Sequence, residues 1–464
     1  MADAAGPSLD TDRRSARPAR SERVRAWLTD GSASGIAQRF AGLAYLFRIA
    51  NAGIAFLTQI LLARWIGAHE FGIYAYVWTW VLLLGTLSNL GLGTSPQRFI
   101  PTYLERGEMD MLRGFVDGGR WLAFGLSSLL AGVAALGLLQ FSDHLQSWPL
   151  VPFYLGLACL PLVVLTEVQG GIARTYDWPQ LAMAPTFLLR PLLLILVFAG
   201  MHVLGFEANA VGAMIAAIIA TWITAAWQFL ALGRRLKGAL PAGPKVYAPK
   251  AWLRASFPQF MLEGFYLLLT YSDVILLERF VSPDQVAIYY AATKLVSLVA
   301  FVYFSVAAAA AHKFTHYHVA DRPEELHAFM RASIRWTFLP SLAMSVAVLA
   351  LGGPLLSLFG PGFAEGTVLL PVLLLGLLAR ASIGPVEKLL AMVGHQDVCA
   401  LVYAIAFVVN IGLNLLLVPV SGLMGAAIAT SIALVVESIL LFLITRRRLG
   451  LHVFYWGGRR HRAS

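Results

Sequence analysis

Apolar blocks of helix length recur through most of this chain, from residue 42 to residue 444. Each holds about 20 mainly apolar residues, the length that a helix needs to cross the hydrocarbon core of a bilayer. Glycine, proline and charged residues separate them, which places the breaks between helices. A membrane β-barrel would need segments of about 10 residues with alternating polarity, so the pattern predicts an all-α protein. We count twelve blocks, at 42–64, 71–93, 119–140, 150–168, 183–203, 210–231, 257–279, 286–309, 334–352, 366–385, 398–418 and 422–444.

The composition agrees with a polytopic membrane protein. Of the 464 residues, 58% are hydrophobic and 13% are charged, whereas an average soluble protein is roughly 45–50% apolar and about 25% charged. A soluble core cannot absorb that excess, so an ordinary soluble enzyme is excluded. Only two cysteines are present, Cys159 and Cys399, and both lie in or beside apolar blocks. They do not form the framework of a disulfide-rich protein.

The basic residues predict the orientation of the chain. With the N-terminus inside, 29 of the 35 Lys and Arg residues fall in cytoplasmic stretches. Cytoplasmic loops carry such an excess in membrane proteins, so both termini are expected in the cytoplasm. Short clusters such as 446–448 also suit anionic lipids of the inner leaflet, and they flank membrane segments, which argues against nucleic acid as a partner. The remaining six Lys and Arg residues lie elsewhere. Two are in outer loops, Arg64 and Arg279, and four are inside helices, Arg48, Arg190, Lys294 and Arg380.

The second half of the chain repeats the first. Residues 60–76 (ILLARWIGAHEFGIYAY) and 275–291 (ILLERFVSPDQVAIYYA) match at 6 of 17 positions without a gap, at an offset of 215. The same offset aligns Arg98 with Lys313 and Arg120 with Arg335. Six spans per copy is an even number, so both copies have the same orientation. We therefore expect two six-helix lobes related by an axis along the membrane normal, as in parallel-repeat transporters, with a cavity between them.

The repeat also sets the expected domain organisation. A basic stretch without an apolar block precedes the first span, and it lacks the apolar core of a secretory signal, so a disordered cytoplasmic arm is expected there. The predicted parts are the arm (1–41), the N-terminal lobe (42–236), a cytoplasmic linker (237–256), the C-terminal lobe (257–445) and a basic tail (446–464).

Polar residues inside the first and seventh spans mark the candidate site. An ionisable residue at the bilayer centre costs at least about 2.5–3.5 kcal/mol, which makes it a functional candidate. In each span the polar residues recur at steps of three and four, which places them on one helical face. Offset 215 relates Arg48 to Glu263, so the two faces are predicted to meet at a water-filled interface between the lobes. The stripes are Arg48, Asn51 and Gln59 in the first span and Gln259, Glu263, Tyr266, Thr270 and Asp273 in the seventh.

Two interpretations of these stripes stay open. They line a substrate cavity, or Arg48 and Glu263 form a buried ion pair that holds the lobes together. Outside the stripes, Lys294 shares its face with Tyr290, and both are candidates to line the cavity. Arg190 and Arg380 either line it too or extend to the lipid headgroups. The carboxylates Glu263, Asp273 and Glu437 are candidate sites for a coupling Na⁺ or H⁺, Glu437 having a structural hydrogen bond as its alternative.

Catalytic motifs are not found. Neither a nucleotide-binding loop of the GxxxxGK[ST] type nor a metal-ligand set with suitable spacing occurs in the sequence. We therefore expect no catalytic residue, no bound metal and no cofactor other than a coupling ion. Besides a transporter of an anionic cargo, the charge pattern leaves three classes of protein open. They are a multidrug antiporter, a membrane polysaccharide polymerase or glycosyltransferase, and a scaffold that transports nothing. The short outer loops argue against the polymerase.

The first pair of spans, FRIANAGIAFLTQILLARWIGAHEFGIYAYVWTW with the following LSNLGLGTSPQRFIPTYLERGE, resembles a known family. It is similar to Wzx-type polysaccharide-transport flippases of the multidrug/oligosaccharidyl-lipid/polysaccharide exporter superfamily, as is SDVILLERFVSPDQVAIYYAATKLVSL in the second lobe. The resemblance covers residues 42–445 and is a pattern of helices and loops, not a short motif. It implies two bundles around a central cavity that opens alternately to each side.

The resemblance also implies a cargo. The family moves undecaprenyl-diphosphate-linked oligosaccharides across the bacterial inner membrane for O-antigen and exopolysaccharide synthesis, beside polymerases and glycosyltransferases. On that basis Arg48 and Lys294 would receive the diphosphate or an acidic sugar, while Asn51, Gln59 and Tyr290 would hydrogen-bond the glycan. Glu263 and Asp273 would repel an anion, so they are expected to pair with basic groups or to bind the coupling ion.

Overall fold

The computed structural model describes residues 33–140 and 150–455, with side chains from residue 53 onward except that of residue 312. Contacts divide the chain into a short N-terminal unit, residues 1–50, and a main unit, residues 51–464. In the N-terminal unit, the described residues 33–50 form the beginning of helix α2 (Ala33–Asn89), which therefore starts before the predicted position 42. The main unit holds the rest of α2 and every other described helix.

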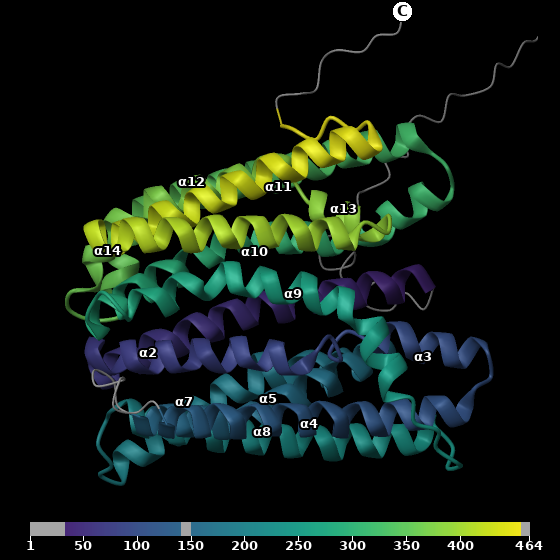
Figure 1. Cartoon of the computed structure of the whole chain (residues 1–464), viewed down its shortest axis with the longest axis horizontal. Coiled ribbons are helices and arrows are strands. Elements are labelled where there is room, and N and C mark those ends of the chain that lie inside the picture. The colour runs from purple at the N-terminus through teal and green to yellow at the C-terminus, as the bar shows by residue number, and fades with distance from the viewer. Residues whose placement is uncertain (1–32, 141–149, 456–464) are drawn as a thin grey trace, which may run out of the picture. The chain divides into compact units, whose positions relative to one another are not determined.

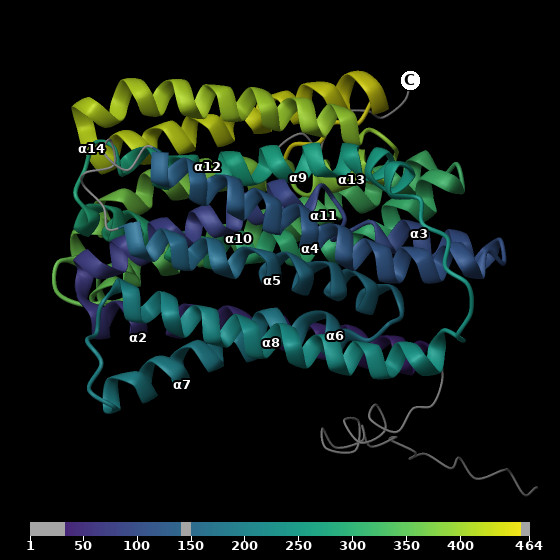
Figure 2. The same ribbon diagram turned by 60° about the horizontal axis from the view of Figure 1, so that its bottom comes forward.

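Every regular element in the described residues is helical, and most helices run side by side along one direction (Figures 1 and 2). The first half contains α2, α3 (Pro96–Glu105), α4 (Met109–Gln140), α5 (Leu150–Thr175), α6 (Pro179–Ala184), the π-helix η2 (Pro185–Leu189), α7 (Arg190–Val203) and α8 (Ala210–Ala239). The second half contains α9 (Pro249–Leu277), α10 (Pro283–Val319), α11 (Pro323–Ser357), the 3₁₀-helix η3 (Phe363–Leu369), α12 (Leu370–Ile383), α13 (Val386–Met392) and α14 (Gln396–Leu449).

The twelve predicted spans are all present in the described residues. Ten stretches are long and apolar enough to cross a membrane. Two of them, α2 and α14, each contain a glycine with non-helical angles that divides them into two helices, Gly67 (φ 81°) and Gly422 (φ 52°). Glycine adopts such angles without a steric penalty, and for this reason it can separate two helices without a loop. The fold is thus the predicted all-α membrane architecture.

Helix ends differ from the prediction where the first turns are charged. Helix α4 begins at Met109 instead of residue 119, and α11 begins at Pro323 instead of residue 334. Their opening turns hold acidic and basic residues that a hydropathy criterion assigns to loops. Helix length therefore exceeds membrane length, and these turns extend beyond the apolar segment.

Contacts group the helices into two lobes. In the first lobe α5 packs against both α4 and α8, and α7 packs against α8; in the second, α9 and α12 pack against α14, and α10 packs against α11. In Figure 1, α4, α5 and α8 lie together below, and α11, α12 and α14 lie together above. The exact lobe boundaries from the repeat stay a prediction.

At one end the two lobes share a single apolar core. Its buried residues come from α2, α5, α7 and α8 of the first lobe and from α9, α10, α11, η3, α12 and α14 of the second. Phe71, just after the bend in α2, contacts the rings of Tyr290, Phe359 and Phe363. Two other cores each stay within one half, apart from Trp252 of α9, which joins the core of the first lobe. The lobes are therefore in apolar contact at the end where α2 bends.

Polar contacts reinforce the same end. Arg64 Nε donates a 2.7 Å hydrogen bond to the carbonyl of Leu358, and Tyr76 donates to Glu278. His69 Nδ1 lies 3.1 Å from Asp284 Oδ2, and both side chains are exposed. We call residues 64–76 and their partners at this end the closed end. Positive-inside topology predicts that the closed end lies on the outer side of the membrane.

At the opposite end, the linker between the lobes is held on α4. Lys245 Nζ lies 2.8 Å from Asp117 Oδ2, and the amide of Val246 donates to the carbonyl of Asp110. The hydrogen bond with Asp117 raises the pKa of Lys245. Beyond the linker, the indole of Trp252 donates to the Tyr103 hydroxyl over 3.1 Å. The start of α9 is thus attached to the first lobe, although the rest of α9 packs in the second.

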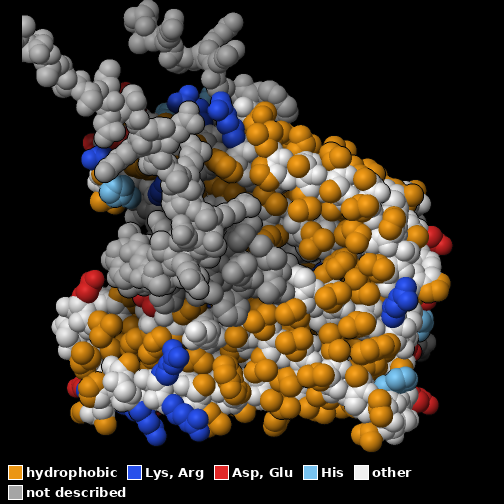
Figure 3. All heavy atoms as spheres, turned by 180° about the vertical axis from the view of Figure 1, so that it is seen from behind, with side chains coloured by type: hydrophobic (Ala, Val, Ile, Leu, Met, Phe, Trp, Pro, Cys, Tyr) orange, Lys and Arg blue, Asp and Glu red, His pale blue; other side chains and the backbone are white. Residues whose placement is uncertain are grey.

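The surface of the described residues matches a membrane environment. Figure 3 shows a broad area of hydrophobic side chains across one face, with most of the visible Lys and Arg side chains toward one end. Large exposed apolar residues are found on the spans of both lobes, among them Leu136, Leu196, Trp336 and Leu416. An exposed apolar surface of this extent is stable only against lipid or another protein.

Candidate functional site

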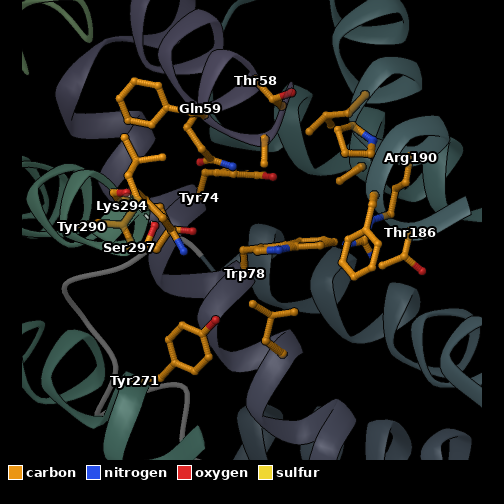
Figure 4. Close-up of a pocket in the computed structure, with 18 of the residues that line it drawn as sticks. Thr58, Gln59, Tyr74, Trp78, Thr186, Arg190, Tyr271, Tyr290, Lys294 and Ser297 are labelled. Atoms are coloured by element: carbon orange, nitrogen blue, oxygen red, sulfur yellow. Dashed lines mark hydrogen bonds between the residues drawn. The ribbon is translucent and has the colours of Figure 1, made fainter. Parts of the chain in front are cut away.

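A cavity of about 450 Å³ lies between the lobes. The first lobe contributes α2, η2, α7 and α8 to its wall, and the second contributes α9 and α10. Its polar and aromatic lining residues appear in Figure 4. Those labelled there are Thr58, Gln59, Tyr74, Trp78, Thr186, Arg190, Tyr271, Tyr290, Lys294 and Ser297, and Phe56, Phe187 and Phe301 complete the aromatic lining.

Two cations face this cavity from different lobes. Arg190 of α7 and Lys294 of α10 lie on opposite sides of it in Figure 4. The Arg190 guanidinium lies 5.3 Å from the centre of the Trp78 ring, and the Lys294 ammonium lies 4.5 Å from that of Tyr290. Cation–π contacts position a charge without neutralising it. Within the described residues, neither cation has an ion-pair partner, and no Asp or Glu lines the cavity.

A second cavity of about 280 Å³ adjoins the first. The two share wall residues that include Thr186, Arg190 and Tyr271. The second adds a further cation, Arg174, and one carboxylate, Glu167, both from α5. With its threonine hydroxyls, this chamber is polar, and Glu167 partly balances its two arginines, Arg174 and the shared Arg190, whereas no described carboxylate balances the cations of the first chamber.

A local irregularity of the helix brings Arg190 to the cavity wall. The span that contains it changes from α6 to the π-helix η2 and then to α7, with Pro179, Pro185 and Pro191 along it. A π-helical turn widens the helix and shifts the following residues around its axis, and such turns are frequent at functional sites. Thr186, inside η2, and Arg190, directly after it, both line the two chambers.

Four of the sequence-predicted site residues lie together at the cavity. Gln59 comes from α2, Arg190 from α7, and Tyr290 and Lys294 from α10. The Oε1 atom of Gln59 is buried and has no hydrogen-bond partner among the described residues. A buried amide oxygen without a partner is available to a ligand or a water molecule. The binding role of these four residues remains a prediction.

The predicted stripe on α9 is displaced from the cavity face. Leu267 and Tyr271, one turn apart, are the α9 residues that line the chambers. Tyr266 points instead into the second lobe, where its ring contacts Tyr403. The cavity face of α9 is thus displaced by about one residue from the predicted face. Steps of three and four fit two adjacent faces of a helix equally well, so the spacing did not distinguish them.

The remaining α9 candidates have different surroundings. Thr270 is exposed and donates to the carbonyl of Tyr266. Glu263 accepts a 2.8 Å hydrogen bond from Gln259 and interacts electrostatically with Arg174 of the first lobe. Glu263 is therefore close to the interface, as predicted, although it does not line either chamber.

Asp273 faces the interior of the second lobe. It is 2% exposed and accepts hydrogen bonds from the hydroxyls of Tyr289 and Thr430 and from the amide of Val274. Asn410 in turn donates to Thr430, which extends the polar network into α14. The prediction that Asp273 lies on the inter-lobe face was therefore wrong. Hydroxyl groups on α10 and α14 supply the hydrogen bonds of its carboxylate inside the lobe.

Arg380 and Glu437 also lie away from the cavity. Arg380 Nε is 3.3 Å from Glu437 Oε1, inside the second lobe, and both side chains are almost fully buried. Arg380 does not extend to the lipid headgroups and does not line the cavity, so both predicted environments were wrong. Arg48 and Asn51 lie outside the residues whose side chains are described, and their predicted roles stay predictions.

Several cavity residues were missed by the sequence reasoning. Trp78, Tyr74 and Tyr271 lie in apolar blocks, where an aromatic residue is read as core. Arg174 and Glu167 lie near the end of a span, where Arg174 was counted as part of the positive-inside signal. Spacing along the chain, which identified Tyr290 beside Lys294, cannot identify Trp78 beside Arg190, because Trp78 and Arg190 lie on different helices. In the described ranges, no group of three or more His, Cys, Asp or Glu is arranged to hold a metal ion.

Two family models match the sequence. One, described as polysaccharide biosynthesis protein, matches residues 41–312, and the other, described as MatE, matches residues 260–416. Together they cover both lobes and the cavity between them. Comparison with curated proteins gives no match.

Solved structures share the fold at low sequence identity. An inward-facing multidrug resistance MATE family transporter of the MOP superfamily has a TM-score of 0.67 and 18% identity, over 92% of this chain and 97% of that one. The lipid II flippase MurJ, in an inward closed conformation, has a TM-score of 0.66 and 16% identity, over 87% of each chain. A MOP superfamily transporter from Pyrococcus furiosus has a TM-score of 0.61 and 16% identity, over 89% of this chain and 95% of that one.

Proposed function

Because this chain belongs to the polysaccharide biosynthesis protein family, whose model matches residues 41–312, we propose that it moves a lipid-linked oligosaccharide across the membrane by alternating access. The resemblance to flippases of the MOP superfamily is confirmed, and the chain is a multi-pass transporter and not an enzyme. The proposal concerns its cargo, which we take to be an oligosaccharide on undecaprenyl diphosphate.

The observation that carries this proposal is the charge of the first chamber. Arg190 and Lys294 face it, and among the described residues no carboxylate lines it. A diphosphate placed there would form charge-assisted hydrogen bonds with both cations, each contributing about 1.5–3 kcal/mol. Since the two cations come from different lobes, one anion bound to both would also draw the lobes together.

The neighbouring chamber suits the glycan. Its wall combines threonine hydroxyls with one Glu and two Arg, which are donors and acceptors for sugar hydroxyls. Tyr271, which lines both chambers, and Trp78, which lines the first, provide flat apolar surfaces for the faces of sugar rings. Gln59, with its unpartnered buried Oε1, would accept a hydrogen bond from a sugar hydroxyl. The lipid chain would stay in the bilayer, outside the gap between the lobes.

A multidrug antiporter is the second candidate, and the MatE match and the MATE structures favour it. An organic cation in the first chamber would meet Arg190 and Lys294 without a compensating carboxylate. Like charges repel strongly in a chamber of low dielectric constant. This argument supports an anionic cargo over a cationic one.

The proposal includes the cellular setting and the energy source. We place the protein in the bacterial inner membrane with both termini in the cytoplasm, on the distribution of its basic residues. Anionic inner-leaflet lipids would contact its cytoplasmic clusters, and polymerases and glycosyltransferases would act before and after it. A Na⁺ or H⁺ gradient would drive transport, with Glu263, Asp273 and Glu437 as the candidate coupling residues.

The test follows lipid-linked glycan in cells. Deletion of the gene should trap the glycan on the cytoplasmic leaflet, where a reagent added outside intact cells does not label it. Restoring the wild-type chain should restore labelling, whereas Arg190→Gln and Lys294→Gln should each lower it by about 10- to 150-fold, the loss of one charge-assisted hydrogen bond.

Lys250→Gln provides the matched control, because it removes the same charge at an exposed position outside the cavity. It should label like wild type. Normal outward delivery in the deletion strain, with no other carrier present, would refute the proposed cargo. Export of an organic cation by the wild-type chain, lost in the same two variants, would favour the antiporter.

A further inference from the structure

A second polar cluster lies inside the C-terminal lobe, away from both chambers. It consists of Arg380 on α12, Glu387 on α13 and Glu437 on α14, and we call it the Arg–Glu–Glu cluster. Arg380 Nε lies 3.3 Å from Glu437 Oε1, and Arg380 Nη2 lies 3.4 Å from Glu387 Oε2. None of the three lines the chambers between the lobes.

Three tyrosine rings enclose the arginine. Arg380 Nη2 donates a 2.9 Å hydrogen bond to the hydroxyl of Tyr403. The guanidinium also lies 4.8 Å from the ring centre of Tyr303 and 5.3 Å from that of Tyr266. Tyrosine is uncharged at neutral pH, so these rings exclude water without balancing charge. The cluster is a largely buried site with contributions from α9, α10, α12, α13 and α14.

The number of charges in the cluster does not balance. One arginine faces two glutamates, so full ionisation would leave one excess negative charge. A buried charge without a partner costs several kcal/mol, and a buried carboxyl usually takes up a proton instead. More distant groups, Lys388 on α13 and Asp397 near the start of α14, carry opposite charges and cancel each other. Cys399 donates to the backbone carbonyl of Glu387 and adds no charge.

The geometry indicates which carboxyl holds the proton. The Glu437 side chain is 0% exposed, while that of Glu387 is 18% exposed. Neither Oε atom of Glu437 accepts an aligned hydrogen bond from the described residues, although Arg380 Nε is within ion-pair distance. An ionised carboxylate beside a guanidinium normally forms short, aligned hydrogen bonds. A neutral Glu437 fits this contact better.

The cluster also spans a break between two helices. Helix α12 ends at Ile383, Gly384 has a φ of 65°, and α13 begins at Val386. Arg380 and Glu387 therefore belong to separate helices that can shift about the glycine. If Glu437 loses its proton, its attraction to Arg380 strengthens, and α12 is drawn toward α14.

We propose that the Arg–Glu–Glu cluster holds one exchangeable proton, on Glu437, and that its loss and uptake couple a proton gradient to movement within the C-terminal lobe. The inference rests on the proposed function of the chain as a cation-driven transporter, and it names the proton as the coupling ion. Proton release would leave Arg380 paired with two ionised glutamates, a state that the lobe tolerates only when the cluster opens to water.

Infrared difference spectroscopy tests the proposal on the full-length protein in lipid nanodiscs, without any cargo. Protonated carboxyls give a C=O stretching band that ionised carboxylates lack. The wild-type protein should show such a band from the cluster, and this band should disappear as the pH is raised. Glu437→Gln should lose this band. Glu387→Gln should lose it too, since a single remaining glutamate would stay ionised beside Arg380.

The controls separate a shared proton from an isolated acid. Glu167→Gln, which alters a glutamate of the second chamber, should keep the pH-dependent band of the cluster. Persistence of the band in Glu437→Gln would overturn the proposal, and so would its persistence in Glu387→Gln. Glu387 is partly exposed, so its variant should fold even where Glu437→Gln does not. Because no cargo is present, a failure of the flippase proposal leaves the spectrum unchanged.

Discussion

Gly72 is the position where one methyl group should open the closed end. It lies in α2, directly against the start of α10 in the other lobe. A Cβ atom built on Gly72 would lie 1.9 Å from the carbonyl oxygen of Pro283 and 2.6 Å from its carbonyl carbon. Both are backbone atoms, so no side-chain rotation relieves the clash. Gly72→Ala therefore requires the lobes to separate here by about 1.5–2 Å to reach van der Waals contact.

The expected size of the effect follows from overpacking. Inserting one methyl into a packed core costs about 1–3 kcal/mol. The closed state carries this cost and a state with separated lobes does not, so the closed population should fall by about 5- to 150-fold relative to the open one. In α7, Gly200→Ala is the matched control, because a Cβ there meets no atom within 4 Å.

Cross-linking measures the closed population. In a background without Cys159 and Cys399, cysteines replace His69 and Asp284, whose side chains are in contact across the closed end. A short bifunctional thiol reagent should join them quickly in the parent and in Gly200→Ala, and more slowly in Gly72→Ala. Equal cross-linking rates in all three proteins would show that the lobes do not pack here as described.

Three more predictions use separate features. Gly384→Ala should lower the unfolding temperature in detergent more than Gly394→Ala: both positions have positive φ, but only at Gly384 does the new Cβ meet backbone and side-chain atoms of Ile334, 3.0 and 2.8 Å away. Equal losses would mean that backbone strain alone matters. Trp78→Leu should lower glycan labelling by less than Arg190→Gln, since it removes the cation–π contact, about 0.5–2 kcal/mol, and keeps the charge; a larger loss than Arg190→Gln would contradict this ranking. The linker should become sensitive to protease at alkaline pH. Its Lys245–Asp117 contact raises the pKa of Lys245. The contact therefore stabilises the attached linker fully below about pH 10.4, and this stabilisation is lost as the pH rises through the raised pKa. Lys245→Ala should be cleaved in the linker at every pH, and a wild-type linker that is equally resistant above that pKa would refute the role of the contact.

The helical architecture was predictable because it depends on local composition. Spans of about 20 apolar residues and their breaks are visible in the sequence, but several helix ends lie outside the predicted spans, among them the start of α2, the start of α9 and the charged first turns of α4 and α11. Helices α2 and α14 are each continuous across two predicted spans. The glycines with non-helical angles, Gly67 and Gly422, lie at the predicted boundaries between those spans. Hydropathy and the repeat together therefore predicted the fold.

The candidate site was only partly predictable, because its residues meet across helices. Lys294 and Tyr290 were found since they share one face of one helix. The face of α9 could not be determined, since its polar residues fit two orientations and the choice depends on hydroxyls of α10 and α14 that satisfy Asp273. Arg380 and Glu437 were each identified as ionisable residues in spans, but their pairing depends on the packing of α12 against α14.

The contact between His69 and Asp284 has a consequence for the origin of the chain. These residues are separated by 215 positions, which is the offset of the internal repeat. Equivalent residues of two copies touch only on the axis that relates them. In an ancestral homodimer of six-helix subunits, this position would have met its own copy, as in any isologous interface. Two aspartates there would repel each other, and so would two protonated histidines. An attractive pair of unlike residues at this position therefore requires two halves that differ in sequence, as the halves of a single chain can.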